Sequence, residues 1–297
     1  MKNKIKILLT GSGGFIGKNI LDQLGDKYDF ITPRSTELNL CNSEEVQDYI
    51  KKCLPDIVIH CANLGGTRRK NDSDDILEMN LKMFFNIARC NKYFGRMIML
   101  GSGAEYGKQD DISQVQETDF DKKVPTDHYG LYKYICAQYV QQVNFITHLR
   151  IFGIFGRYED YAIRFISNNI CRTLLNLPIS INQDVYFDYI FIDDFVKIVD
   201  YFIAHQGKET VYNVGSGQRI LLSDIAKKIK QESGKKIEIK IKKDGLNNEY
   251  SCDIARLRKE IPNLKFTSMD EAISELFSFY SKKINIIQKD DVLLEQC

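Results

Sequence analysis

The stretch that decides the fold is Thr10-Gly11-Ser12-Gly13-Gly14-Phe15-Ile16-Gly17, which stands between an apolar run and an amphipathic segment. The sequence predicts a strand at Ile5–Leu9 before it and a helix at Ile16–Leu24 after it. Gly11 permits a sharp turn, Gly14 leaves room for a pyrophosphate, and Gly17 allows helix and strand to pack closely. We expect a dinucleotide to be bound by Gly11, Gly13, Gly14, Phe15, Ile16 and Gly17.

Short apolar runs continue to alternate with amphipathic stretches up to about residue 152. Further strands are predicted at Phe30–Thr32, Ile57–His60, Met97–Leu100 and His148–Phe152, and helices at Ser43–Cys53, Ile76–Tyr93 and Tyr129–Val143. This alternation is typical of βαβ units. The predicted fold is therefore α/β, a Rossmann-like doubly wound parallel sheet with a smaller C-terminal α/β substrate lobe.

The regular alternation of apolar runs and amphipathic stretches ends near Gly156, and this change indicates a division of the chain into two parts. We expect residues 1–155 to form the dinucleotide-binding core, with about 184–214 returning to it, and residues 156–183 and 215–297 to form the substrate lobe. In this second part we predict helices at Tyr161–Leu175, Asp193–Ala204, Ser223–Glu232 and Ser268–Phe279, and strands at Tyr186–Ile192 and Ile237–Ile241. The last stretch, Ile284–Cys297, is expected to fray.

Composition excludes several classes of protein. The 41 basic and 40 acidic residues leave a net charge of +1, so no global field favours nucleic acid or an anionic membrane. The first ten residues hold only a short apolar run, too short for a signal-peptide core or a membrane span, and we expect a cytoplasmic protein. The cysteines and histidines show no metal-ligand spacing, so no metal site is expected.

The end of the second predicted strand bears on the choice of cofactor. A carboxylate there would hydrogen-bond a ribose 2′-hydroxyl, but the sequence after Phe30 offers Arg34 instead. A guanidinium suits the 2′-phosphate of NADP(H). NADP(H) is therefore favoured, while NAD(H) stays open because Arg34 has an alternative role as an ordinary solvated arginine.

Three residues suggest acid–base chemistry. Tyr129 and Lys133 lie four residues apart, which places them one turn apart on one helix face, where the ammonium would favour a phenolate. Such a pair also arises by chance. Its context strengthens it, because the predicted strand Met97–Leu100 leads into Ser102, at the sheet edge where open α/β sheets bind ligands.

Taken together, the motifs resemble those of extended short-chain dehydrogenase/reductases, in their sugar-nucleotide epimerase/dehydratase/reductase branch. The shared motifs are the glycine loop, Ser102 four residues before Tyr106-Gly107, Pro125-x-x-x-Tyr129-x-x-x-Lys133, Asp193-Asp194 and Tyr212–Gly217. The resemblance implies that Tyr129 is the general acid/base, Lys133 holds the nicotinamide ribose, and Ser102 hydrogen-bonds the reacting oxygen. It also implies cofactor contacts at Leu40, Ala62 and Asn80, although Asn80 has an alternative role as a helix-surface amide.

Departures from the family pattern narrow the reaction. The 4,6-dehydratases of the family carry an Asp-Glu pair where this chain has Gly103 and Ala104, and fucose-synthase-like enzymes carry a cysteine at the second position. Neither dehydration nor epimerisation by those routes is expected. We expect an NADPH-dependent reductase of a 4-keto, 6-deoxy nucleotide-linked sugar. The alternatives are an NAD(P)-dependent 4-epimerase and a non-catalytic NADP-binding regulatory protein.

The substrate diphosphate lacks its usual partner. Where the family has an Arg-Asp pair this chain has Phe187-Asp188, so we consider other arginines as substrate ligands, each of which has a solvated alternative role: Arg157, Arg164 and Arg219. The resemblance further implies a homodimer, built from the helices that contain Ile76 and Tyr129, and a part in polysaccharide assembly.

Overall fold

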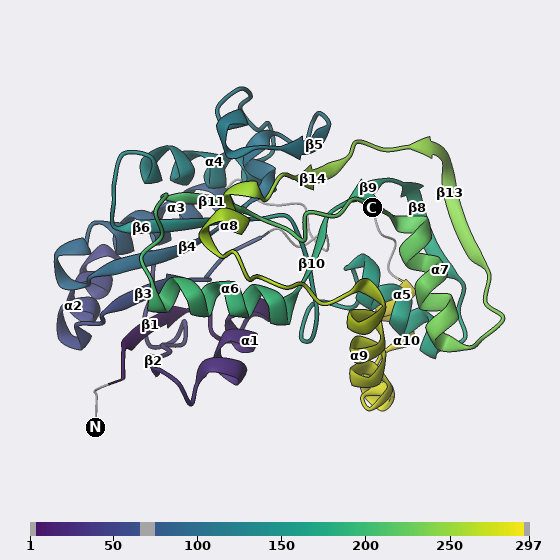
Figure 1. Cartoon of the computed structure of the whole chain (residues 1–297). Coiled ribbons are helices and arrows are strands. Elements are labelled where there is room, and N and C mark those ends of the chain that lie inside the picture. The colour runs from purple at the N-terminus through teal and green to yellow at the C-terminus, as the bar shows by residue number, and fades with distance from the viewer. Residues whose placement is uncertain (1–3, 66–74, 294–297) are drawn as a thin grey trace.

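A six-stranded parallel sheet forms the centre of the computed structural model, which describes residues 4–65 and 75–293 (Figure 1). Its order from edge to edge is β2-β1-β3-β4-β6-β11. The strands are β1 (Lys6–Thr10), β2 (Asp29–Ile31), β3 (Ile57–His60), β4 (Arg96–Ser102), β6 (Ile146–Ile151) and β11 (Val211–Val214). The chain runs from β1 to one edge and returns on the other side, so β1 and β3 flank the point at which such sheets bind ligands.

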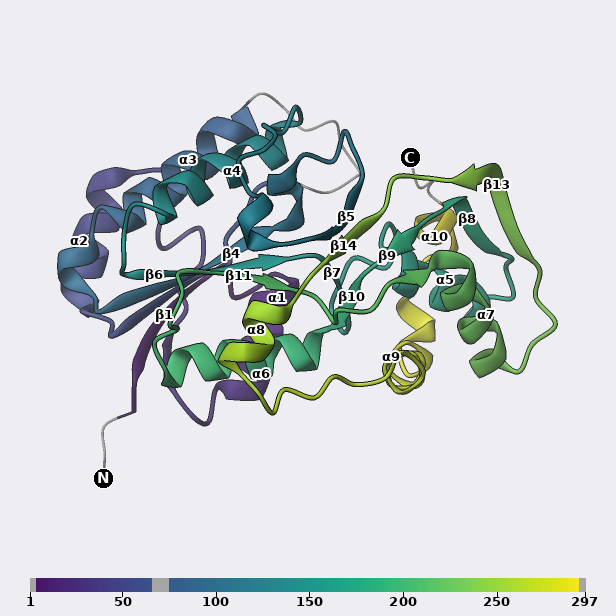
Figure 2. The same cartoon turned by 45° about the horizontal axis from the view of Figure 1, so that its top comes forward.

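Helices cover both faces of this sheet (Figure 2). One layer contains α1 (Phe15–Leu24) and α6 (Ile192–Ala204), and the other contains α2 (Ser43–Cys53), α3 (Asp75–Ala88) and α4 (His128–Val140). Alternate side chains of each strand enter opposite layers. Along β1, for example, Ile7 and Leu9 belong to one apolar cluster and Leu8 to the other. The apolar runs of the sequence therefore become strands buried on both sides.

A second lobe lies to the right of the sheet in Figures 1 and 2. It contains α5 (Phe165–Leu174), α7 (Leu222–Ser233), α9 (Met269–Ser281), α10 (Lys289–Leu293) and the parallel pair β8 (Ile179–Asp184) and β13 (Ile239–Leu246). A further helix, α8 (Ala255–Glu260), packs near β11.

Two small sheets lie between the lobes. One pairs β7 (Gly153–Phe155) with β10 (Tyr189–Phe191), and the other has the order β12 (Ile220–Leu221), β9 (Tyr186–Phe187), β14 (Tyr250–Cys252) and β5 (Ile112–Val115). Short 3₁₀ turns occur at Asn91–Tyr93, Gly103–Tyr106, Glu117–Asp119 and Ile284–Ile286. Because β5 and β14 are far apart in the sequence, this second sheet brings the C-terminal lobe against the edge of the core.

The predicted α/β class, with a doubly wound parallel sheet, is confirmed. Some element predictions were wrong in their bounds, since the strand expected at Ile237–Ile241 is β13 (Ile239–Leu246) and the helix expected at Tyr161–Leu175 is α5 (Phe165–Leu174). Three others were wrong in further ways. The strand expected at Tyr186–Ile192 is two strands, because β9 pairs with β14 and β12 whereas β10 pairs with β7. The helix expected at Ile76–Tyr93 ends at Ala88, and a separate 3₁₀ turn follows. The tail expected to fray forms α10 up to residue 293, with Val292 buried and its carbonyl bound by Arg172.

The domain boundaries at residues 155, 184 and 214 stay a prediction. The structure places β11 and α6 with the large sheet and β8 with the second lobe. Within residues 4–65 and 75–293, none of the helices has the length and apolarity needed to cross a bilayer.

Candidate active site

The glycine loop joins β1 to α1 in a geometry that only small residues allow. Gly11 has a φ of +70°, and a Cβ there would lie 2.6 Å from the backbone nitrogen of Ala62. A Cβ on Gly17 would lie 2.3 Å from the carbonyl oxygen of Gly11, whereas one on Gly13 would meet open space. The structure therefore gives Gly11 the turn and Gly17 the close packing that the sequence predicted.

The N-terminus of α1 is suited to an anion. Its N-cap residue, Gly14, provides no side-chain cap, and the first turn contains no acidic residue. The unpaired backbone N–H groups and the positive end of the helix dipole therefore face the loop without a competing carboxylate. This arrangement fits the pyrophosphate of a dinucleotide.

The ends of β1 and β3 are tied together beside the loop. Thr10 Oγ1 lies 2.8 Å from His60 Nδ1 and accepts a hydrogen bond from the Ala62 backbone N–H at 3.4 Å. Burial lowers the pKa of His60 to about 3, so its ring is neutral at physiological pH. These contacts place Ala62 against Gly11, where the backbone was expected to follow the cofactor. Across the described parts of the chain, no group of three metal-ligand side chains is close enough to hold a metal ion.

Asn80 supports this region from α3. Its side-chain amide is 2% exposed, donates to the carbonyl oxygens of Leu64 and Ile76, and accepts from the Leu64 N–H at 3.0 Å. The predicted alternative, a helix-surface amide, is therefore wrong. Asn80 holds the segment after β3, and direct contact with a cofactor stays a prediction.

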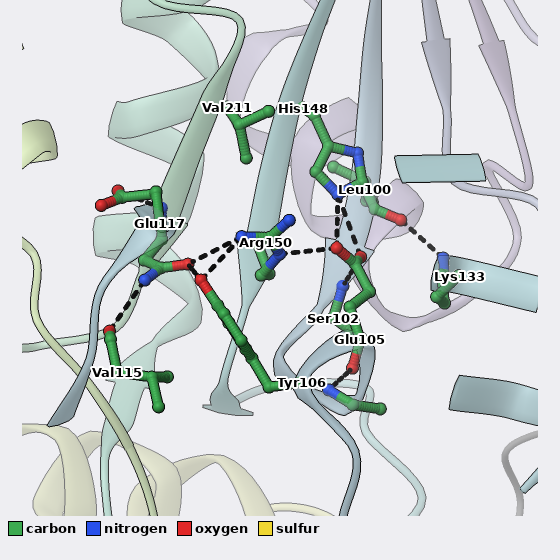
Figure 3. Close-up of polar contacts among 12 residues, drawn as sticks. Leu100, Ser102, Glu105, Tyr106, Val115, Glu117, Lys133, His148, Arg150 and Val211 are labelled. Atoms are coloured by element: carbon green, nitrogen blue, oxygen red, sulfur yellow. Dashed lines mark hydrogen bonds and ion pairs between the residues drawn. The ribbon is translucent and has the colours of Figure 1, made fainter. Parts of the chain in front are cut away.

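The three residues predicted for catalysis come together at the edge of the sheet. Ser102 ends β4 and caps the 3₁₀ turn that follows, where its Oγ accepts from the Ala104 N–H at 3.2 Å. Tyr129 lies in the first turn of α4, and Lys133 lies one turn later. Lys133 is buried, and its Nζ lies 5.9 Å from the centre of the Tyr129 ring. It also donates to the Leu100 carbonyl oxygen at 2.5 Å (Figure 3).

One cleft of about 1050 Å³ connects these groups with the glycine loop. A cavity of this size holds a large ligand or two ligands together. The predicted site residues that line it are Gly11, Gly14, Phe15, Ile16, Gly17, Ser102, Tyr129, Lys133 and Arg164. The predicted residues outside its lining are Gly13, Arg34, Leu40, Ala62, Asn80, Arg157 and Arg219. The structure thus joins the glycine loop and the three residues predicted for catalysis in one space.

The three candidate arginines lie in different settings. Arg157 donates to Asp193 at 2.9 Å on the side of α1 and α6. Arg219 donates to Glu249 at 2.7 Å and stacks on the Tyr186 ring. Arg164, which precedes α5, lies in the lining of the cleft. Of the three, Arg164 is therefore the one that lines the cleft, and its contact with a substrate diphosphate stays a prediction.

Sequence reasoning missed several polar residues of the cleft, and three of them have informative contacts. Lys108 Nζ lies 5.1 Å from the centre of the Tyr129 ring, and the Tyr250 hydroxyl lies 3.5 Å from Ser102 Oγ. Glu159 is 5% exposed and hydrogen-bonds Ser167, and burial raises its pKa to about 7. Lys108 directly follows the Tyr106-Gly107 motif, a signal that could have found it. Neither Tyr250 nor Glu159 lies in a local motif.

A buried carboxylate lies behind Ser102 (Figure 3). Glu105 accepts from the Ser102 backbone N–H at 2.8 Å, from Arg150 Nε at 2.5 Å, and contacts His148 Nε2 at 2.9 Å. Although burial alone would raise it, His148 and Arg150 together lower the pKa of Glu105 to about 2. The carboxylate is therefore charged and fixes the backbone of Ser102.

Comparison with known proteins agrees with this geometry. Residues 7–215 match the profile of the NAD dependent epimerase/dehydratase family. The chain belongs to this family. The predicted family is thus confirmed, as is the prediction of a nicotinamide-dependent enzyme. The matched segment includes the glycine loop, Ser102, Tyr129 and Lys133, whose individual roles stay predictions.

Individual curated relatives share only modest sequence identity with this chain. The GDP-L-colitose synthase of Yersinia pseudotuberculosis is 32% identical over 147 residues, which are 47% of this chain and 48% of that protein. The match therefore spans about half of this relative. The dTDP-4-dehydro-6-deoxyglucose reductase of Escherichia coli is 25% identical over 91% of this chain and 96% of that protein.

Solved structures share the fold of this chain. A GDP-L-fucose synthetase from Naegleria fowleri, bound to NADP, superposes with a TM-score of 0.83. Its sequence identity is 15%, and the superposition covers 97% of this chain and 96% of that one. At this identity the likeness describes the arrangement of the two lobes rather than the substrate.

Proposed function

We propose that this chain is an NADPH-dependent reductase of a 4-keto, 6-deoxy sugar linked to a nucleotide. The observation that carries the proposal is the content of the cleft, in which Ser102, Tyr129 and Lys133 lie beside the glycine loop while Gly103 and Ala104 supply no acid or base. A relative aligned over most of the chain is a reductase of a dTDP-linked 4-dehydro-6-deoxy sugar, which supports the same reaction.

The residues of the cleft suit the reduction of a carbonyl to an alcohol. The glycine loop with Gly11, Gly14 and Gly17 would hold a nicotinamide cofactor, which in its reduced form would supply a hydride to the carbonyl carbon. Tyr129 donates its phenolic proton to the carbonyl oxygen, so that one hydride and one proton convert C=O to CH–OH. Ser102 Oγ donates a hydrogen bond to the same oxygen as charge develops on it. The neighbouring ammonium of Lys133 stabilises the phenolate that remains on Tyr129.

Arg34 supports the choice of NADP(H). Its side chain is exposed at the end of β2, and within the described residues its guanidinium enters no ion pair. The backbone N–H of Arg34 donates to the Glu37 carboxylate at 2.8 Å, so one oxygen of that carboxylate already has a hydrogen-bond partner. An exposed guanidinium at this strand end is suited to a 2′-phosphate.

The cofactor choice is tested by titrating NADPH and NADH into wild type, Arg34→Ala and a control, Arg89→Ala, which alters an exposed arginine directly after α3. We expect wild type and control to bind NADPH at least tenfold more tightly than NADH, and Arg34→Ala to lose most of this preference. Equal affinities of the wild type for NADPH and NADH would contradict the proposed preference for NADP(H).

The reaction itself is tested by following NADPH oxidation with dTDP-4-dehydro-6-deoxyglucose and with a GDP-linked 4-keto-6-deoxyhexose. Turnover of either supports the reductase. Oxidation of NADPH by neither would refute it.

A 4-epimerase is the second candidate, because Ser102, Tyr129 and Lys133 could equally serve to oxidise and reduce one carbon in turn. A cofactor that purifies with the protein in near-stoichiometric amount would favour it. A non-catalytic regulatory protein is disfavoured because Tyr129 and Lys133 both line the cleft.

We further propose a homodimer in the cytoplasm that acts in polysaccharide assembly. Helices α3 and α4 lie side by side on one outer face of the sheet, as a two-helix contribution to a bundle requires (Figure 2). The seven described cysteines are all unpaired, which suits a reducing compartment. Light scattering of the purified protein tests the dimer, and a monomer at all concentrations would overturn it.

A further inference from the structure

Tyr250 reaches the edge of the large sheet from the other end of the sequence. It begins β14, 148 residues after Ser102, yet its hydroxyl lies 3.5 Å from Ser102 Oγ. Backbone hydrogen bonds fix it on both sides, since the Asp188 N–H donates to the Tyr250 carbonyl at 3.0 Å and the Ile112 N–H to that of Glu249 at 2.9 Å. The position of this phenol is therefore set by the small sheet between the lobes.

The ring of Tyr250 is held by other aromatic rings. Its centre lies 5.0 Å from that of Phe152 and 4.9 Å from that of Phe187. A Cβ added to Gly103 would come within 2.6 Å of the Tyr250 hydroxyl and 2.8 Å of the Phe152 ring. The phenol thus occupies the space that a side chain after Ser102 would fill, which explains the glycine at this position.

The hydrogen-bonding capacity of Ser102 gives this contact a direction. A serine hydroxyl has one proton to donate and can accept two hydrogen bonds. The Ala104 N–H already donates to Ser102 Oγ at 3.2 Å. If Tyr250 donates as well, both acceptor positions are used and the serine proton is left to point into the cleft.

Resting on the proposed reductase function, we propose that Tyr250 is a positioning residue that donates to Ser102 Oγ and thereby aims the serine proton at the substrate carbonyl oxygen. Burial raises the pKa of Tyr250, so the phenol keeps its proton and acts as a donor rather than a base. Tyr250 therefore acts through Ser102, unlike Tyr129, whose own proton is transferred.

The test compares the purified full-length variants Tyr250→Phe, Ser102→Ala and their double mutant, with dTDP-4-dehydro-6-deoxyglucose or the GDP-linked ketosugar as substrate. Tyr250→Phe keeps the ring and removes one neutral hydrogen bond, so we expect kcat to fall about three- to tenfold with little change in KM. NADPH affinity should not change. Because Tyr250 acts through Ser102, the double mutant should be no slower than Ser102→Ala alone.

A matched control is Tyr186→Phe, which removes a hydroxyl from the neighbouring strand β9 outside the cleft and should leave kcat unchanged. Two results would overturn the inference while the reductase stands: Tyr250→Phe with wild-type kcat, or a double mutant whose losses multiply. If the wild type binds NADPH but reduces neither ketosugar, the proposed function fails and this inference falls with it.

Discussion

Arg150 and Glu105 form an ion pair inside the protein, with Arg150 Nε 2.5 Å from Glu105 Oε2 and side chains that are 1% and 0% exposed (Figure 3). The pair joins β6 to the turn after β4. Arg150 also donates to the Tyr106 hydroxyl at 2.7 Å, and Glu105 accepts from the Ser102 N–H. The position of Ser102 therefore depends on charges that lie outside the cleft.

The first prediction concerns this pair. Glu105→Gln leaves the guanidinium of Arg150 buried without a counter-charge, and we expect it to destabilise the fold by about 3 kcal/mol, measured by urea unfolding. Adding Arg150→Met removes the unpaired buried charge and should recover part of the lost free energy of unfolding. A control is Glu78→Gln, which breaks an exposed pair with Lys82 and should leave stability unchanged. Equal effects of the buried and exposed substitutions would contradict the role of burial.

The second prediction separates two glycines of the same loop. Gly17→Ala places a methyl group 2.3 Å from the Gly11 carbonyl, so helix α1 must move away from β1. We expect a loss of stability of about 2 kcal/mol or more and NADPH binding weakened at least tenfold. Gly13→Ala meets no atom within 4 Å and is the matched control for stability. Thermal melts and NADPH titrations decide, and equal stability losses in the two variants would disprove the packing argument.

The third prediction is a pH effect at Glu159. Burial raises the pKa of this carboxyl from 4.5 to about 7, so the folded state favours the protonated form. The stability it contributes is complete below pH 4.5 and is lost as the pH rises through 7. Glu159→Gln imitates the protonated form. We therefore expect the variant to match wild type near pH 4.5 and to have the higher melting temperature at pH 8. If the variant and the wild type had equal melting temperatures at pH 8 as well as at pH 4.5, the raised pKa of Glu159 would be contradicted.

Local patterns were enough to predict the turn at the glycine loop and the placement of Tyr129 and Lys133 on one helix. Gly11 and Gly17 both belong to the connection between one strand and the helix that follows it. Tyr129 and Lys133 lie one turn apart on a single helix. Ser102 needed only the direction of its strand, because the carboxyl ends of parallel strands meet at one edge. Because contacts between near neighbours in the sequence set each of these positions, a short sequence motif is enough to predict them.

The rest of the site depends on pairings between distant segments. Whether an arginine meets solvent, a carboxylate or a ligand was set by Asp193 for Arg157 and by Glu249 for Arg219. Tyr250 reaches Ser102 because β14 pairs with β5, an arrangement with no local pattern in the sequence. Burial of Glu159 likewise follows from the packing of the second lobe. Such contacts come from tertiary structure alone.

The last prediction distinguishes proton donation from cofactor binding. Tyr129→Phe removes the proton donor but keeps the ring, so we expect kcat to fall by about 10²- to 10⁴-fold while the Kd for NADPH changes less than about twofold. Lys133→Met removes the buried ammonium and its hydrogen bond to Leu100, and should weaken NADPH binding as well as kcat.

The control for this pair is Tyr139→Phe, which removes a hydroxyl from the same helix outside the cleft and should have wild-type kinetics. Stopped-flow NADPH titrations and steady-state rates separate the effects. A Tyr129→Phe enzyme with wild-type kcat would mean that another group delivers the proton, and Lys108, whose ammonium approaches the same ring, would be the first to examine. A loss confined to NADPH affinity would instead make Tyr129 a binding residue.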